Sequence, residues 1–272
     1  MTPPTRPSAR IIVVLVEPQH PGNVGAAARA MQNFGLDQLV LVAPPAYDPE
    51  RARWMAPGCA PLLASARIVA SLDEALEGVH CAWATTARHR RDGQPVLEPA
   101  AAAARIHDDA PRVHALLFGR EDHGLSNDAA RRCASLVRIP TTEHASLNLG
   151  QAVLLMAHAV FEEGRRRGQR ADGRTLSGPG RSRSTRDVQR PSPRDQLADL
   201  AALEPAAEEL LALLGRVGYL RGTPAHKVQL TARQALQRGS LSLRHVEALR
   251  GMLSRIQWAL DHPDMDWEAP RG

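Results

Sequence analysis

Residues 11–34 read IIVVLVEPQHPGNVGAAARAMQNF, and this stretch decides the fold. Its first six residues are all apolar, which is typical of a strand that is covered on both faces of a parallel sheet. A turn with Gly22 and Gly25 follows, and the alanine-rich residues 24–34 predict a helix. A strand, a glycine-containing turn and a helix that opens on small residues together offer backbone N–H groups to an anion.

The same alternation of short apolar runs and helical segments continues to residue 163. It predicts an α/β domain with a mainly parallel sheet. The other predicted strands lie at residues 39–42, 67–69, 81–85, 113–118 and 136–139. The other predicted helices lie at residues 72–76, 100–106, 126–134 and 148–166.

Composition divides the chain into four parts. Residues 1–10, with three prolines, predict a disordered tail, and residues 11–163 form the predicted α/β domain. Residues 164–194 are rich in Arg, Gly, Ser and Pro and have little to bury, so they predict a basic flexible linker. Apolar residues at helical spacing in residues 195–272 predict a small all-helical C-terminal domain.

Charge is concentrated in the predicted linker. The whole chain has 34 Lys and Arg against 29 Asp and Glu, a net charge of +5. Residues 164–194 hold ten arginines and two aspartates, so the rest of the chain carries a net charge of −3. Any argument for nucleic-acid binding from net charge therefore concerns this segment, which either contacts nucleic-acid phosphates or is a solvated tether.

Several classes of protein are disfavoured. The three cysteines, Cys59, Cys81 and Cys133, are far apart and odd in number, so we expect neither a disulfide framework nor a cysteine zinc site. We expect the protein to be located in the reducing cytoplasm. The longest apolar stretch, residues 152–161, is about half of the roughly 20 residues that a membrane span needs. We therefore expect no membrane partner.

Two further polar loops follow predicted strands. Residues 117–127 read LFGREDHGLSN, and residues 139–153 read IPTTEHASLNLGQAV. The carboxyl ends of parallel strands meet at one edge of a sheet, where α/β proteins bind ligands. The alternative is that these loops are ordinary turns, with Asn23, Ser126 and Asn148 as helix caps. The adjacent acids and histidine of the second loop point apart, so we expect no metal.

Two enzyme classes have little support. A dinucleotide-binding site needs Gly-x-Gly-x-x-Gly, and here only Gly-x-x-Gly follows the first strand. The second strand ends in Val42-Ala43-Pro44, without an acid for a ribose diol, which disfavours a nicotinamide-dependent dehydrogenase. A hydrolase is disfavoured because no Gly-x-Ser-x-Gly motif accompanies the polar loops.

Taken together, the three loops resemble a known family. They contain Asn23-x-Gly25-x-x-x-Arg29, then Phe118-Gly119-Arg120-Glu121-x-x-Gly124-Leu125-Ser126-Asn127, then Ile139-Pro140 with Ser146-Leu147-Asn148-Leu149. In order and spacing these motifs resemble the SpoU-type (TrmH-like) RNA ribose 2′-O-methyltransferases of the SPOUT superfamily. Residues 20–31, 85–88 and 249–253 are most similar to members that modify cytidine or uridine 32 of the tRNA anticodon loop.

The resemblance implies a fold, a cofactor and partners. It implies S-adenosylmethionine as methyl donor, a trefoil knot in the C-terminal part of the α/β domain, tRNA as substrate, and a homodimer with each site near the subunit boundary. It places the cofactor against Thr85, Thr86, Ala87, Gly119, Ile139, Ser146, Leu147 and Asn148. It also makes Arg29 the central catalytic residue, with Asn23, Glu121 and Ser146 as candidate orienting groups or proton acceptors.

The chemistry of arginine limits what Arg29 is expected to do. An arginine side chain has a pKa above about 12 and binds anions, so holding a phosphate suits it better than accepting a proton. Two alternatives stay open for the whole chain. One is a 2′-O-methyltransferase that acts on rRNA or on another tRNA position. The other is a knotted RNA-binding protein without activity.

Overall fold

The computed structural model describes residues 9–45, 47–87, 94–109, 112–142, 147–172, 194, 196–220 and 224–263. Contacts divide the chain into two compact units, Met1–Gln189 and Arg190–Gly272. Each unit is described by itself. The predicted tail up to residue 8 and residues 173–193 of the predicted linker lie outside the described residues.

The first unit is built on a seven-stranded sheet in which every strand pair is parallel. This confirms the predicted α/β class. In sheet order the strands are β3 (Arg67–Val69), β2 (Gln38–Val42), β1 (Arg10–Val16), β6 (Val113–Phe118), β4 (Cys81–Thr85), β7 (Ser135–Val137) and β5 (Val96–Leu97). The sequence did not predict β5, because two residues are too few to establish a period.

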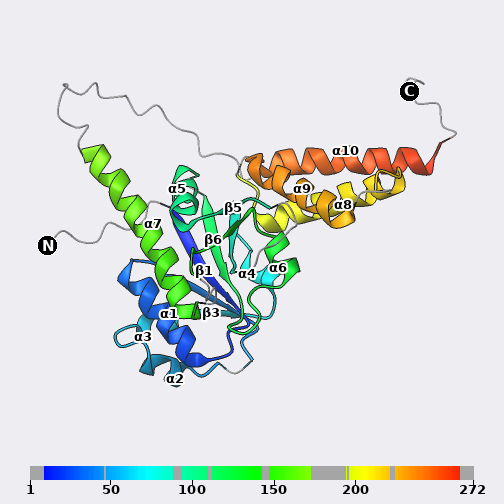
Figure 1. Cartoon of the computed structure of the whole chain (residues 1–272). Coiled ribbons are helices and arrows are strands. Elements are labelled where there is room, and N and C mark those ends of the chain that lie inside the picture. The colour runs from blue at the N-terminus through cyan, green and yellow to red at the C-terminus, as the bar shows by residue number, and fades with distance from the viewer. Residues whose placement is uncertain are drawn as a thin grey trace, which may run out of the picture. The chain divides into compact units, whose positions relative to one another are not determined.

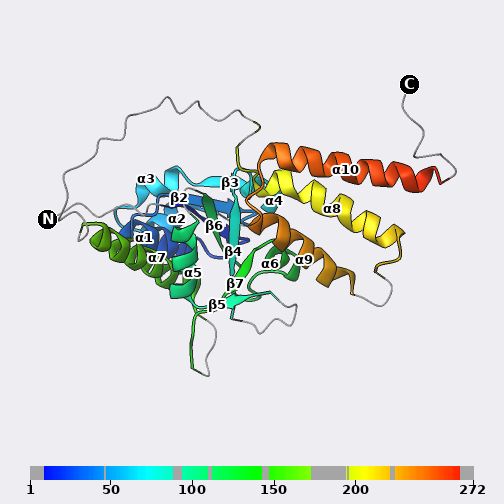
Figure 2. The ribbon, with the colours of Figure 1, turned by 90° about the horizontal axis from the view of Figure 1, so that it is seen from above.

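Helices cover both faces of the sheet. Figure 2 shows α1 (Pro21–Asn33), α5 (Pro99–Asp108) and α7 (Leu149–Asp172) on one face, and α4 (Leu72–Ala75) and α6 (Asn127–Arg131) on the other. The core of the first face joins Val13 and Leu15 of β1 to Met31 of α1 and Met156 of α7, all of them fully buried. The continuous apolar run of β1 therefore has a covered face on each side, as the sequence predicts.

Two short helices are not predicted from the sequence. They are α2 (Pro49–Trp54) and α3 (Ala60–Ala64), and both pack near α1 (Figure 1). Each has a proline in its first turn, where the missing N–H costs no helical hydrogen bond. Helices of five or six residues are too short to show a 3.6-residue period, so only their packing on α1 defines them.

Helix α7 corrects a predicted boundary. It extends to Asp172, beyond both the predicted helix end at residue 166 and the predicted domain end at residue 163. Arg165 pairs with Glu162, and Arg166 and Arg167 pair with Glu163, at helical spacings that stabilise this last part of the helix. The last part of α7 has the arginine-rich composition of a linker, because the acids that pair with its arginines, Glu162 and Glu163, precede residue 164.

The second unit consists of helices among its described residues. They are α8 (Leu200–Arg216), α9 (Ala225–Arg238) and α10 (Leu243–Asp261). Leu203, Ala206 and Val246 form its small apolar core, and Ser242 caps α10. Across the part of the chain that the structure describes, no helix combines the length and the apolar character that crossing a membrane requires.

Candidate active site

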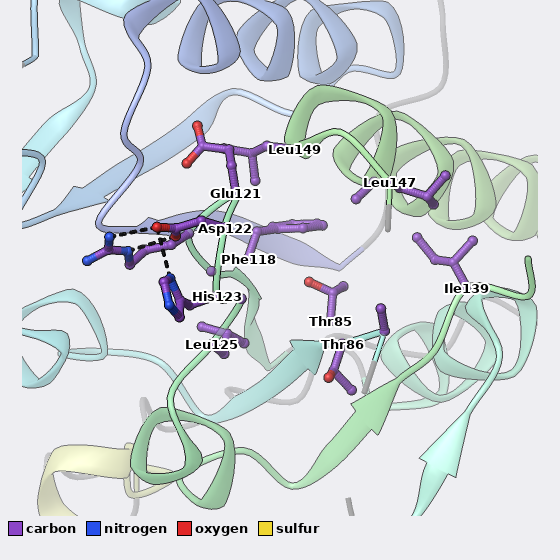
Figure 3. A pocket seen from close by; sticks show the side chains of 15 residues that line it. Thr85, Thr86, Phe118, Glu121, Asp122, His123, Leu125, Ile139, Leu147 and Leu149 are labelled. Carbon is purple, nitrogen blue, oxygen red and sulfur yellow. Dashed lines mark hydrogen bonds and ion pairs between the residues drawn. The ribbon is translucent and has the colours of Figure 1, made fainter. Parts of the chain in front are cut away.

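A cavity of about 370 Å³ lies at the carboxyl ends of β6, β4 and β7, which are neighbours in the sheet (Figure 3). Pockets of about 300–1,000 Å³ are typical sites for small molecules and cofactors. The cavity has an apolar side and a charged side. Its lining consists of Thr85, Thr86, Ala87, Phe118, Gly119, Arg120, Glu121, Asp122, His123, Gly124, Leu125, Ile139, Leu147, Leu149 and Ala152.

Most of the residues predicted to bind the cofactor line this cavity. They are Thr85, Thr86, Ala87, Gly119, Ile139 and Leu147. Asn148 is not among the lining residues, and Ser146 lies outside the described residues. The resemblance named these positions, and most of them meet because they lie at or just after the carboxyl ends of parallel strands.

Hydrogen bonds fix the strand ends that form the floor of the cavity. The Thr85 hydroxyl donates to the carbonyl of Leu117 at 2.6 Å and so joins the end of β4 to β6. The backbone N–H of Thr86 donates to the carbonyl of Val137 at 2.9 Å and joins it to β7. The three lining loops therefore start from fixed points.

The loop after β6 folds back closely on itself. A Cβ atom added at Gly119 would lie 2.1 Å from the Leu125 nitrogen and 2.2 Å from the Gly124 carbonyl carbon, so no other residue fits at position 119. Gly124 has a φ of +65°, and its N–H donates to the Arg120 carbonyl at 2.8 Å. Gly119 thus allows the close backbone contact in this loop, and Gly124 allows its positive φ.

A cluster of charged side chains lies at the polar rim of the cavity. Arg120 pairs with Asp122 at 3.0 Å and with Glu17, which directly follows β1, at 3.3 Å. His123 contacts Asp122 at 2.8 Å. The hydrogen bond from Arg120, supported by His123, holds the pKa of Asp122 well below its usual range. The described residues hold no group of three His, Cys, Asp or Glu side chains suited to a metal ion.

A chain of hydrogen bonds connects the three sequence motifs. The Asn23 Nδ2 group, in the first turn of α1, donates to Glu121 Oε1 at 2.7 Å. Asn148 Nδ2 donates to Asn23 Oδ1 at 2.9 Å, and the Gly150 N–H donates to Asn148 Oδ1 at 2.9 Å. The chain therefore runs from the second motif through the first to the start of α7.

Glu121 is the charged end of this chain. Burial alone would raise its pKa, but hydrogen bonds from the Asn23 side chain and from backbone N–H groups, including that of Gln19 at 3.0 Å, outweigh burial and lower the pKa. Glu121 is therefore ionised at neutral pH. Both of its oxygens already accept hydrogen bonds, so its arrangement suits a positioning role more than that of a base.

The structure does not bring Arg29 into the cavity of its own chain. It lies six residues after Asn23, about 9 Å along the axis of α1, with an exposed side chain. Its charge acts on Cys59, next to α3, where it opposes the effect of burial, which raises the thiol pKa. With the described residues Arg29 makes no hydrogen bond or ion pair, so the expected partner is not within this chain's described part.

Three residues of the site were not singled out from the sequence. Gln19 contributes a backbone N–H, Glu17 an ion-pair partner, and Gly150 the last donor of the hydrogen-bonded chain. At Gly150 an added Cβ would lie 2.7 Å from the Cβ of Ala26, so α7 starts in direct contact with α1. The only signal for these residues was their place beside the motifs, which does not distinguish them from ordinary loop residues.

Comparison with known proteins agrees with this geometry. The model of the SpoU rRNA Methylase family matches residues 10–158. TrmJ of Pectobacterium atrosepticum, a tRNA (cytidine/uridine-2′-O-)-methyltransferase, is 34% identical over 251 residues, which cover 91% of this chain and 96% of that protein. A TrmJ of Pseudomonas aeruginosa, a tRNA (cytidine/uridine/adenosine-2′-O-)-methyltransferase, is 46% identical over 154 residues, or 56% of this chain and 60% of that protein.

A solved structure is also similar over nearly the whole chain. It is that of TrmJ from Z. mobilis ZM4, with a TM-score of 0.69 and 31% sequence identity, and the match covers 90% of this chain and 98% of that one. The family that the three motifs resemble is thus confirmed by sequence and structure. The chain belongs to the SpoU rRNA methylase family of RNA-methylating enzymes.

Proposed function

We propose that this protein transfers the methyl group of S-adenosylmethionine to the 2′-hydroxyl of cytidine or uridine 32 in the tRNA anticodon loop. The observation that carries the proposal is the cavity at the ends of β6, β4 and β7, bordered by the hydrogen-bonded chain Glu121–Asn23–Asn148. Similarity to the TrmJ proteins, which by name methylate tRNA cytidine and uridine, supports the substrate.

The cavity has the features that S-adenosylmethionine requires. Leu125, Ile139 and Leu147 offer apolar contacts for an adenine ring, and the close approach of backbone at Gly119 leaves no side chain in the way. Thr85 and Thr86 and the charged rim supply polar groups for the rest of the molecule. S-Adenosylmethionine, when bound, supplies a methyl group on a positively charged sulfur. Ser146, Leu147 and Asn148 complete the proposed cofactor site.

The described residues position the reacting groups. Glu121, which lines the cavity, accepts a hydrogen bond from the Asn23 amide, and Asn23 in turn accepts one from Asn148, so each side chain orients the next. Methyl transfer requires the attacking oxygen to lie in line with the departing sulfur, and positioning of this kind can supply roughly 7–11 kcal/mol. We therefore assign Asn23 and Glu121 to orientation of the ribose, with Ser146 as the remaining candidate to accept the hydroxyl proton.

Arg29 takes part in the site of a second copy of the chain. Its guanidinium suits the phosphate beside the methylated ribose and the negative charge that develops on the 2′-oxygen. Two features support a homodimer: Arg29 is exposed outside its own cavity, and α7 carries the half-exposed Leu154 and Leu155 next to α1. In the same proposal, the family's trefoil knot lies in the part of the chain that leads through β7 into α7.

The decisive experiment is to map 2′-O-methylation across total tRNA and rRNA in a deletion strain and in the strain complemented with the gene. The proposal predicts loss at tRNA position 32 alone, restored by complementation. Loss at an rRNA nucleotide or another tRNA position would replace the substrate but keep the reaction. A full set of methyl groups in the deletion strain, together with RNA binding by the purified protein, would favour a knotted RNA-binding protein without activity.

A further inference from the structure

An exposed tryptophan lies close to the proposed site and has no part in it so far. Trp54, the last residue of α2, is 77% exposed, and Met55 after it is 54% exposed. A large aromatic side chain with so much surface in water is a frequent sign of an interaction site. The core of the first unit does not need it, because Ala52 is the residue of α2 that is buried.

Close packing ties α2 to the first turn of α1. A Cβ atom at Gly25 would lie 2.0 Å from the Ala52 carbonyl oxygen and 3.2 Å from Met55 Cβ, so the two backbones touch at this glycine. One turn earlier, Met55 Cγ lies 3.5 Å from the Cβ position of Gly22. Gly22 directly precedes Asn23, whose amide belongs to the hydrogen-bonded chain at the cavity. The backbone on both sides of Trp54 is therefore fixed against the first turn of α1, the turn that carries Asn23.

The charges around Trp54 favour a nucleic acid. Arg53 precedes it and Arg51 lies on the previous turn. Arg53 pairs with Glu50 of the same helix, and Arg51 pairs with Asp48, the N-cap of that helix. Ion pairs between exposed side chains contribute little, so both guanidinium groups can exchange these acids for phosphates. An aromatic ring flanked by arginines is the combination on which single-stranded RNA stacks its bases, with its backbone on the cations.

We infer that Trp54 stacks on a base of the RNA substrate that neighbours the methylated nucleotide, with Arg51 and Arg53 against the adjacent phosphates. The inference rests on the proposed function for the identity of the RNA. It makes Trp54 a substrate-binding residue that holds the single-stranded loop in place while the ribose lies beside Asn23. The cavity for the cofactor is separate, since Trp54 is not among its lining residues.

The test compares the full-length protein with Trp54→Ala and Trp54→Phe. Ile68→Ala serves as the matched control, because Ile68 is also an exposed apolar residue, 57% exposed on the edge strand β3. For each protein, KM and kcat with a tRNA transcript are measured by tritiated-methyl incorporation, and cofactor affinity by calorimetry. Loss of one stacking interaction predicts a KM for tRNA that is roughly 5- to 100-fold higher in Trp54→Ala. Trp54→Phe should keep a KM for tRNA close to that of the wild type, and Ile68→Ala should keep the wild-type KM. Cofactor affinity should be the same in all of these proteins.

Tryptophan fluorescence gives a readout that does not depend on turnover. Titration with the same transcript should quench the wild-type emission, and most of that quenching should be absent from Trp54→Phe, which keeps the other three tryptophans. If the wild type binds the transcript but methylates nothing, the proposed activity fails while this quenching still decides the role of Trp54. If the wild type does not bind the transcript, both fail.

Three results would overturn the inference while leaving the proposed function intact. One is a Trp54→Ala variant with wild-type KM and wild-type RNA affinity. Another is a Trp54→Ala variant whose oligomeric state changes in light scattering, which would make Trp54 part of a contact between copies of the chain. A uniform loss of kcat with unchanged KM would also contradict a role in RNA binding.

Discussion

The Asn23 side chain donates to the Glu121 carboxylate at 2.7 Å, although the two residues are 98 positions apart in the sequence. This hydrogen bond joins the first turn of α1, which follows β1, to the loop after β6, and the two strands lie side by side. It lowers the pKa of Glu121 and leaves Asn23 with a defined orientation. In the proposed reaction, this pair is the structural basis for orienting the ribose.

Replacement of Glu121 by glutamine should slow methyl transfer. The carboxylate accepts from Asn23 through one oxygen and from the Gln19 N–H through the other, whereas glutamine has a single acceptor oxygen, so one donor is left facing an amide NH₂. An unpaired buried donor costs about 1–3 kcal/mol, and we expect kcat to fall about tenfold or more. The measurement is single-turnover methylation of tRNA.

The matched control for this variant is Asp128→Asn. Asp128 is an exposed acid of α6 that pairs with Arg131 outside the cavity, and its amide variant should keep wild-type kcat. Equal rates for Glu121→Gln and wild type would remove Glu121 from the reaction.

Arg29→Ala should abolish methylation while cofactor affinity stays close to that of the wild type, because Arg29 does not line the cavity. If the arginine acts in the site of a second copy, an inactive Arg29→Ala protein mixed with an inactive Gly119→Ala protein should regain activity. In such a mixed dimer the intact cavity of the first variant receives the intact arginine of the second. Subunits are exchanged by co-expression with two affinity tags.

Recovery of activity in the mixed dimer would be incompatible with an arginine that acts only within its own chain. The reverse result, two inactive variants that stay inactive in a verified mixed dimer, would place Arg29 and the cavity in the same chain's reaction. Turnover by Arg29→Ala alone would show that the residue is dispensable.

Gly119→Ala should destroy the cofactor site. The added methyl group would lie 2.1 Å from the backbone nitrogen of Leu125, so the loop after β6 must move away from the cavity. We expect at least about a tenfold loss of S-adenosylmethionine affinity by calorimetry and a loss of stability of about 1–3 kcal/mol.

The matched glycine is Gly168 in α7, where an added Cβ meets no atom within 4 Å. Gly168→Ala should retain cofactor affinity and raise the free energy of unfolding by about 0.5–1 kcal/mol, because alanine favours the helix. Normal cofactor binding by Gly119→Ala would contradict the assignment of this loop to the cofactor.

His114 should make the α/β unit sensitive to acid. It is fully buried in β6 and accepts a hydrogen bond from the Trp83 indole at 3.2 Å. Burial first, and then the nearby Arg112, His80 and His107, lower its pKa from 6.5 to about 4. As the pH falls below 6.5, His114 becomes protonated in the unfolded chain, whereas in the folded protein it stays neutral down to about pH 4. The free energy of unfolding should therefore decrease by about 3 kcal/mol across this window.

Urea unfolding at pH 7, 5.5 and 4.5 measures this effect. His114→Gln has no titrating group and should lose a large part of the pH dependence between 6.5 and 4, while the exposed His123→Gln should keep it. Identical pH dependence in wild type and His114→Gln would show that other groups are responsible.

Helix α7 narrows the role of the basic segment. Arg165, Arg166 and Arg167 were counted with the ten arginines of residues 164–194, but they are ion-paired at the end of a helix of the α/β unit. Arg167 also reaches Asp108 and the Ala104 carbonyl of α5. Of these three arginines, Arg167, which is held by Glu163, Asp108 and the Ala104 carbonyl, is therefore the least available to RNA phosphates.

Sequence alone determined the class of sheet, the motifs and most of the cavity. Apolar runs such as residues 11–16 require cover on both faces, and residues that follow parallel strands, such as Thr85, Gly119 and Ile139, must meet at one edge. The class of sheet follows from local pattern. The family resemblance named the cofactor residues, and the common direction of the strands explains why they meet.

Only the tertiary structure decided which polar atoms meet and which do not. The hydrogen bond between Asn23 and Glu121 and the position of Met55 beside Gly22 depend on how the loops and helices α1 and α2 pack. The same holds for the place of Arg29 outside the cavity of its own chain. The type and spacing of side chains determine which face of a helix is apolar. How closely two helices approach depends on the packing of both, as at Gly25, where the backbone of α2 lies against that of α1. For that reason the motifs predicted the reaction, and the packing decided the arrangement of the groups proposed to carry it out.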